Sequence, residues 1–172
     1  MTKCLQSFGL LMLLLLASCA SVEEPSDDMV PPDAPRQAEL TRLFDRMGAT
    51  NESTGVAAAK EAASGDDRDH RFMASLWGTR RKSAVGARRY GHALSDAGKH
   101  AEAFDWFERA FLFLPAGDKM LPWLRYEMAN EYYMLGRNDD AVNLLANRMS
   151  TSPLPTELKP KYDALIQKAS AG

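Results

Sequence analysis

The amino-acid sequence predicts an all-α protein, a short α-solenoid of antiparallel helix pairs with a C-terminal capping helix. After Pro35, apolar residues recur at three- and four-residue steps, and no alternating strand pattern of useful length is present. In addition, one order of glycine, alanine and proline occurs twice in the second half of the chain. A length of 172 residues with 45% hydrophobic residues suits one domain with a packed core.

The helical domain is expected over residues 36–172, and its first part contains three helical stretches. The first has one apolar face and ends at Gly48, with Leu40, Leu43, Phe44 and Met47 on that face. An alanine-rich stretch follows Ser53, and a third runs from about Arg68 to Trp77. The region 53–78 is either a degenerate repeat, faintly similar to Sel1-like repeats, or a plain helical cap.

The clearest pattern covers two units, 84–117 and 122–155. Three pairs of residues share an offset of 38 positions: Gly98 and Gly136, Ala103 and Ala141, Pro115 and Pro153. Small residues such as Gly91 and Ala103 let paired helices approach closely. Larger side chains are expected to fill the space between the helices: Tyr90, Phe107, Tyr132 and Leu145.

This pattern resembles the tetratricopeptide repeat (TPR), a helix–turn–helix unit that stacks into solenoids. The sequence departs from the repeat at Arg125, where a large apolar residue is usual, and at Arg148, where alanine is usual. A further amphipathic helix over 156–170, with Thr156 as its N-cap, resembles the capping helix that such stacks need for solubility.

The N-terminus reads as a secretory leader over residues 1–18. Lys3 provides the positive charge, and the apolar run from Phe8 to Ala17 is too short to span a bilayer. Leu16-Ala17-Ser18-Cys19 resembles the lipobox of bacterial lipoproteins, which implies cleavage before Cys19 and attachment of lipid to that cysteine. Ordinary cleavage after Ala20 is the alternative.

Residues 19–35 are predicted to be a lipidated, disordered tether. After Cys19 the segment contains five acidic residues, four prolines and no basic residue. Because Ala20 and Ser21 follow the cysteine in place of an aspartate, the sorting rule for such lipoproteins implies the outer membrane, facing the periplasm. The membrane partner would therefore be reached through the N-terminal lipid.

No catalytic, cofactor or metal motif is found in the sequence. The three histidines lack metal-ligand spacing, and phosphate-loop and nucleophile-elbow motifs are missing. A net charge of −2 argues against nucleic-acid binding. We therefore predict a protein that is not an enzyme, needs no cofactor and binds no nucleic acid.

A basic patch is expected within 68–100, where eight basic residues outnumber two acidic ones. Its candidate members are Arg80, Arg81, Lys82, Arg88 and Arg89. The patch is either a solvated face or a docking surface for an acidic protein tail, lipid A phosphates or an anionic glycan.

The TPR resemblance also implies a partner groove lined by the first helix of each pair. The matching positions are Arg88, His92, Asp96, Trp123, Tyr126, Asn130 and Tyr133. Arginine and asparagine can bind a carboxylate or a peptide backbone, while Trp and Tyr supply rigid contact area. The aromatic residues could equally be core against the capping helix.

The sequence thus favours a membrane-anchored scaffold or adaptor that binds a protein partner in the cell envelope. Small lipoproteins of this kind resemble pilotins and tight-adherence pilus-assembly lipoproteins, which implies a setting in pilus or secretion-system assembly. The alternative is a peptidoglycan- or lipopolysaccharide-binding module that uses the basic region.

Overall fold

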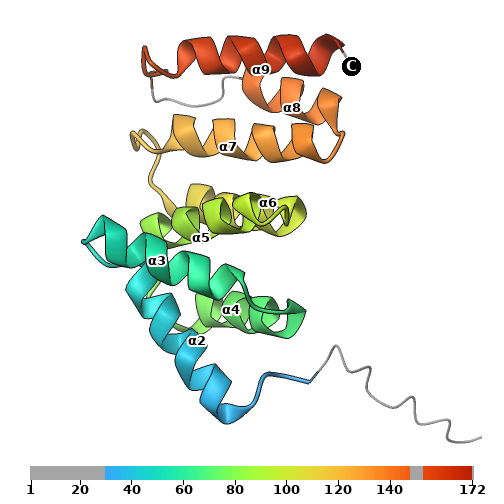
Figure 1. Cartoon of the computed structure of the whole chain (residues 1–172). Helices are drawn as coiled ribbons and strands as arrows, with labels where there is room; N and C mark the ends of the chain where they lie inside the picture. Colours follow the sequence, from blue (N-terminus) through green and yellow to red (C-terminus); the bar gives the residue numbers. More distant parts are fainter. Residues whose placement is uncertain (1–29, 148–152, 172) are drawn as a thin grey trace, which may run out of the picture. The chain divides into compact units, whose positions relative to one another are not determined.

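The computed structural model describes residues 30–147 and 153–171, which contain helices and no strand. The helices of the described residues all belong to one compact unit of the chain, Pro31–Gly172 (Figure 1). Their bounds are α2 Ala34–Met47, α3 Glu52–Ala63, α4 Asp67–Thr79, α5 Ala84–Asp96, α6 His100–Phe113, α7 Leu121–Met134, α8 Asn138–Ala146 and α9 Lys159–Ala171. The predicted all-α solenoid is confirmed.

Several predictions concern residues outside this described part. They are the leader over 1–18, the lipid site at Cys19, most of the tether, and Arg148. None of the helices in the described residues has the length and apolar content needed to cross a membrane.

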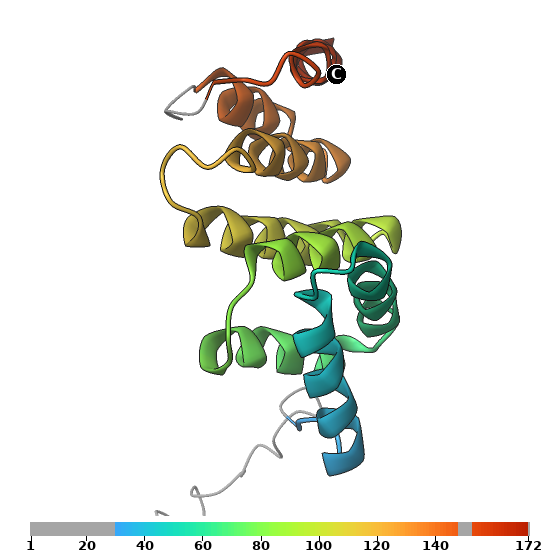
Figure 2. The same cartoon turned by 90° about the vertical axis from the view of Figure 1, so that its left-hand side faces the viewer.

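Helices α5 to α9 form a regular stack. Helix α5 pairs with α6, α7 pairs with α8, and α9 packs on α8 and α7. Figure 1 shows these helices following one another from the middle of the molecule to its C-terminal end, and Figure 2 shows the same order from the side. The two sequence units, 84–117 and 122–155, correspond to the two helix pairs.

Both repeat glycines end the first helix of a pair in the same way. Gly98 has φ 76° and Gly136 has φ 72°, a left-handed conformation that favours glycine. The residue after each glycine donates its N–H back to the helix, Lys99 to the Leu94 carbonyl and Arg137 to the Tyr132 carbonyl. This is the Schellman arrangement, and it turns the chain into the second helix of each pair.

The α5–α6 pair is held by close packing at Gly91. A Cβ built at Gly91 would lie 2.6 Å from the Phe107 ring, so glycine is needed for the two helices to approach this closely. Tyr90, Phe107 and Ala103 are fully buried beside it. The predicted close approach of the two helices at Gly91, with Tyr90 and Phe107 buried between them, is therefore confirmed.

Helices α2, α3 and α4 do not continue this order of pairs. Helix α3 packs against α2 and α5, whereas α4 packs against α2 and scarcely contacts α3. Each begins with a side-chain cap, in which Asp33, Asn51 and Asp66 accept an N–H from the first turn of α2, α3 and α4. The region 53–78 therefore forms two separate helices and no antiparallel pair.

One local prediction differs from the structure, and one departure from the repeat lies inside it. Thr156 is not the N-cap of α9, because residues 156–158 form a turn and the helix begins at Lys159. In that turn the N–H groups of Leu158 and Lys159 both donate to the Pro155 carbonyl. Arg125 is buried in α7 despite its charge, with its guanidinium 5.7 Å from the centre of the Phe111 ring.

Candidate functional site

Helices α5 and α7 are joined by an ion pair on the face where the groove was predicted. Arg88 Nε donates to both carboxylate oxygens of Glu127 at 2.9 Å, and His92 Nε2 lies 3.1 Å from the same carboxylate. Glu127 is only 7% exposed. Burial alone would raise the pKa of Glu127, but the hydrogen bonds from His92 and Arg88 outweigh burial and lower it.

A second carboxylate, one helical turn further along α7, links α7 to the end of α5 and the start of α6. Glu131 is 2% exposed and accepts a hydrogen bond from Ser95 Oγ at 2.8 Å. Its other oxygen lies 2.7 Å from His100 Nδ1. Neither glutamate was predicted from the sequence, because their four-residue spacing places them on one face of α7 but does not determine which helix that face meets.

Most of the predicted groove residues line two separate hollows. The α3–α5 hollow has a volume of about 370 Å³ and contains the three α5 positions of the prediction, Arg88, His92 and Asp96, opposite Glu52 and Lys60 of α3. The α7–α9 hollow has a volume of about 290 Å³. Its principal lining residues are Tyr126, Asn130, Tyr133, Lys161 and Lys168.

The aromatic residues of α7 serve partly as core against α9. Tyr126 stacks on Tyr162, with ring centroids 6.0 Å apart and an interplanar angle of 23°. Trp123 is half-buried under the ammonium group of Lys161, which lies 5.2 Å from its ring. The two alternatives for these residues, groove lining and core, therefore each hold in part. Tyr126 and Tyr133 line the α7–α9 hollow, and they also pack against the buried apolar residues of α9.

Three of the five predicted basic-patch residues are engaged within the protein. Arg88 is paired with Glu127, and Arg80 Nη2 donates to Asp45 at 3.0 Å. Arg89 Nη1 donates to the carbonyls of Met47 and Ala49, at the end of α2. The structure therefore does not bring the five together on one open surface.

Arg81 and Lys82 are the two members without a hydrogen bond or ion pair in the described residues. Both are exposed, and the Lys82 ammonium lies 5.9 Å from the centre of the Trp77 ring. They stand in the segment between α4 and α5, at the rim of a pocket that the sequence analysis did not predict.

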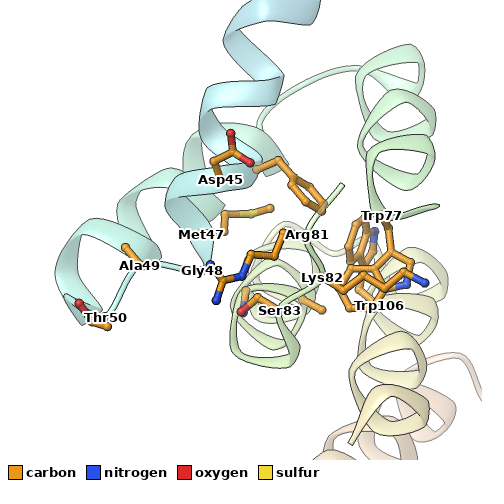
Figure 3. Close-up of a pocket in the computed structure, with 13 residues that line it drawn as sticks. Asp45, Met47, Gly48, Ala49, Thr50, Trp77, Arg81, Lys82, Ser83 and Trp106 are labelled. Carbon is orange, nitrogen blue, oxygen red and sulfur yellow. The ribbon is translucent and has the colours of Figure 1, made fainter. Parts of the chain in front are cut away.

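This aromatic pocket has a volume of about 540 Å³ and is formed where α2, α4, α5 and α6 meet. Its apolar lining comes from Phe44, Met47, Trp77 and Trp106. Figure 3 shows Trp77 and Trp106 on one side of the pocket and Met47, Gly48 and Ala49 on the other. The pocket could not be predicted because its residues are up to 62 positions apart, Phe44 in α2 and Trp106 in α6.

A buried polar chain connects α4 to α5 near this pocket. His70 Nδ1 lies 2.6 Å from Tyr90 Oη, and Lys99 Nζ contacts His70 Nε2 and donates to the Gly65 carbonyl. Because an ammonium group can only donate, Nε2 must accept, and Nδ1 therefore carries the proton of a neutral ring. Burial, followed by the nearby Lys99 charge, lowers the pKa of His70.

The described residues contain no group of side chains suited to hold a metal ion. No protein family, curated protein or solved structure matches the chain.

Proposed function

We propose that this chain is a lipid-anchored, TPR-like adaptor that holds a protein partner at the membrane of the bacterial cell envelope. The observation that carries the proposal is the pair of hollows on the α5, α7 and α9 side of the stack. The α7–α9 hollow combines half-buried tyrosine rings with amide and ammonium groups, and the α3–α5 hollow adds carboxylate and guanidinium groups. This mixture is typical of surfaces that bind peptides.

The buried links between the helices support this role. Glu127 and Glu131 connect α7 to α5 and α6 through Arg88, His92, Ser95 and His100. They fix α5 against α7, and each of these two helices forms one wall of a hollow. A partner would then bind a preorganised surface and lose little free energy in ordering it.

Charge indicates the kind of partner segment that suits the α7–α9 hollow. Lys161 and Lys168 stand on one wall, and Asn130 can hydrogen-bond a peptide backbone from the other. An acidic or C-terminal carboxylate segment complements these groups.

The lipobox at Cys19 supplies the anchor in this proposal. Lipid on that cysteine would place the adaptor on a membrane, and the residues after it favour the outer membrane, facing the periplasm. The resemblance to pilotins and pilus-assembly lipoproteins implies that this adaptor acts in the assembly of a pilus or secretion system. The glycan- or lipopolysaccharide-binding alternative receives less support, because Arg80, Arg88 and Arg89 are engaged internally.

Site-directed photo-crosslinking in intact cells tests the adaptor function. A photoreactive residue at Asn130 is expected to give a discrete adduct with another envelope protein, and one at Asp105 on α6, outside both hollows, is the matched control. Adducts of equal yield at both positions, or none at Asn130, would contradict the proposed site.

Labelling with palmitate tests the anchor separately. The wild-type chain should incorporate label, and Cys19→Ala should not. Equal incorporation in the two chains would remove the lipid anchor from the proposal.

A further inference from the structure

We infer that the aromatic pocket is a second docking site, which takes an acidic segment of a protein partner that inserts a large apolar or aromatic side chain. The pocket lies on a different face of α5 from the α3–α5 hollow. Gly86 and Ala87 line the aromatic pocket, whereas Arg88 and His92 line the hollow. The inference therefore goes beyond the proposed function, which rests on the two hollows.

The apolar lining of the pocket fits a large side chain. Trp77 and Trp106 contact one another edge to face, with ring centroids 5.9 Å apart. Met47 and Phe44 of α2 complete the lining. A volume of about 540 Å³ lies in the usual range for binding sites and leaves room for an inserted aromatic side chain.

The charges at the rim select an acidic partner. Arg81 and Lys82 have no carboxylate partner within the described residues, in contrast to the neighbouring Arg80. The carboxylate of Asp45 also lines the pocket, but it is paired with Arg80 at 3.0 Å. Two cations therefore remain available for aspartate or glutamate side chains of a bound segment.

The apolar surface continues outside the pocket, which favours a polypeptide over a small molecule. Phe113 packs edge to face on Trp77 at 5.8 Å and is 50% exposed, and Leu112 beside it is 73% exposed. A small ligand seated in the pocket would leave these side chains in water. A peptide segment can fill the pocket and cover Phe113 as well.

Peptide titration of the purified full chain in mild detergent tests this inference. The probe is a rhodamine-labelled peptide with a central phenylalanine flanked on each side by two aspartates, followed by fluorescence anisotropy. We expect saturable binding that weakens as salt rises, because exposed charges are screened. Replacing the aspartates by asparagine, or the phenylalanine by alanine, should weaken binding by about tenfold or more.

The same loss is expected for Arg81→Glu/Lys82→Glu with the original peptide. Arg71→Glu/Lys119→Glu makes the same charge change at exposed positions outside the pocket and should bind normally. Should the first variant lose helical circular dichroism, Arg81→Gln/Lys82→Gln replaces it. The inference is overturned by absence of saturable binding, by equal binding of the asparagine peptide, or by retained binding in the pocket variant.

Vesicles provide a further arm that separates a protein segment from a lipid surface. Phosphatidylglycerol vesicles that bind through Arg81 and Lys82, with no peptide binding, would assign the pocket to a membrane and overturn the inference. The outcome is separable from that of the proposed function, because crosslinking at Asn130 reports on the α7–α9 hollow alone.

Discussion

The two halves of the helical unit are held together by different kinds of contact. In the C-terminal half, α5 to α9, helices approach closely at Gly91 and are linked by the buried carboxylates Glu127 and Glu131. In the N-terminal half, α3 also packs closely through its buried alanines, but α4 meets α5 and α6 of the C-terminal half through long side chains, His70 on Tyr90 and Trp77 on Trp106. Close packing gives a fixed surface, whereas contact through long side chains leaves a pocket.

The largest effect is expected when the link between α5 and α7 is broken. Arg88→Met leaves Glu127 buried with only His92 beside it, so the free energy of unfolding should fall by about 3 kcal/mol. Chemical denaturation monitored by circular dichroism measures the change.

The double variant Arg88→Met/Glu127→Met is the matched control. It removes the stranded charge, so its loss should be smaller than that of Arg88→Met alone. A double variant as unstable as the sum of both single variants would contradict the account of this link.

A pair of glycine substitutions compares packing in the two halves directly. Gly91→Ala should lower the free energy of unfolding by about 2 kcal/mol, because the new Cβ meets the buried Phe107 ring. Gly78→Ala near the end of α4 meets no atom within 4 Å and should stabilise by about 0.5 kcal/mol through helix propensity. Thermal unfolding of both variants measures the two changes in stability. The contrast would be refuted if both substitutions changed the stability in the same direction.

Much of the C-terminal half could be predicted from local rules. Gly98 and Gly136 lie where a left-handed residue must end a helix, and Gly91 lies where two helices cross, so composition and spacing were sufficient. The acidic partners in the links between the helices, Glu127 and Glu131, could not be identified this way. Whether Glu127 faces Arg88 depends on how two helices 39 residues apart are rotated about their axes, which local periodicity does not determine.

The N-terminal half was less predictable for a related reason. Its helices were identified from their apolar faces, but the contacts of α3 with α5 and of α4 with α2 depart from the order of pairs. The aromatic pocket is lined by α2 and α4 of this half together with α5 and α6. The misassigned N-cap at Thr156 has another cause, because a proline-preceded turn competed with the capping preference of threonine.

A smaller effect on the free energy of unfolding, which depends on pH, is expected from His70, where α4 meets α5. Burial and the Lys99 charge lower the pKa of His70, so the unfolded chain binds this proton more readily than the folded chain. The stabilisation is complete above the ordinary histidine pKa of 6.5 and is lost as pH falls below it, at no more than about 1.4 kcal/mol per pH unit.

His70→Gln is the control, because a glutamine amide can donate to Tyr90 and accept from Lys99 without titrating. As pH falls from about 7.5 to about 5.5, the wild-type chain should lose the stability that depends on neutral His70, and His70→Gln should not. The difference in unfolding free energy between the wild type and His70→Gln should therefore narrow. Hydrogen exchange should accelerate first in α4. Parallel pH profiles would exclude His70 as the cause.

The smallest effect is expected at the exposed ion pair between α2 and the segment after α4. Arg80→Met should change the free energy of unfolding by less than about 0.5 kcal/mol, because Arg80 and Asp45 are both largely in water. If Arg80→Met lowered the free energy of unfolding as much as Arg88→Met, the exposed pair would stabilise the chain as strongly as the buried pair, and the contrast between the two would be refuted. Chemical denaturation of the two variants side by side measures the difference.

The central claim is that the chain holds a partner at a membrane through the α7–α9 hollow. The most direct test measures the chain and its crosslinked partner in the membrane fraction for wild type, Cys19→Ala and Lys161→Glu/Lys168→Glu. The account predicts that Cys19→Ala removes both from the membrane, whereas the lysine variant stays on the membrane and loses the partner. Full partner recovery with the lysine variant would contradict it.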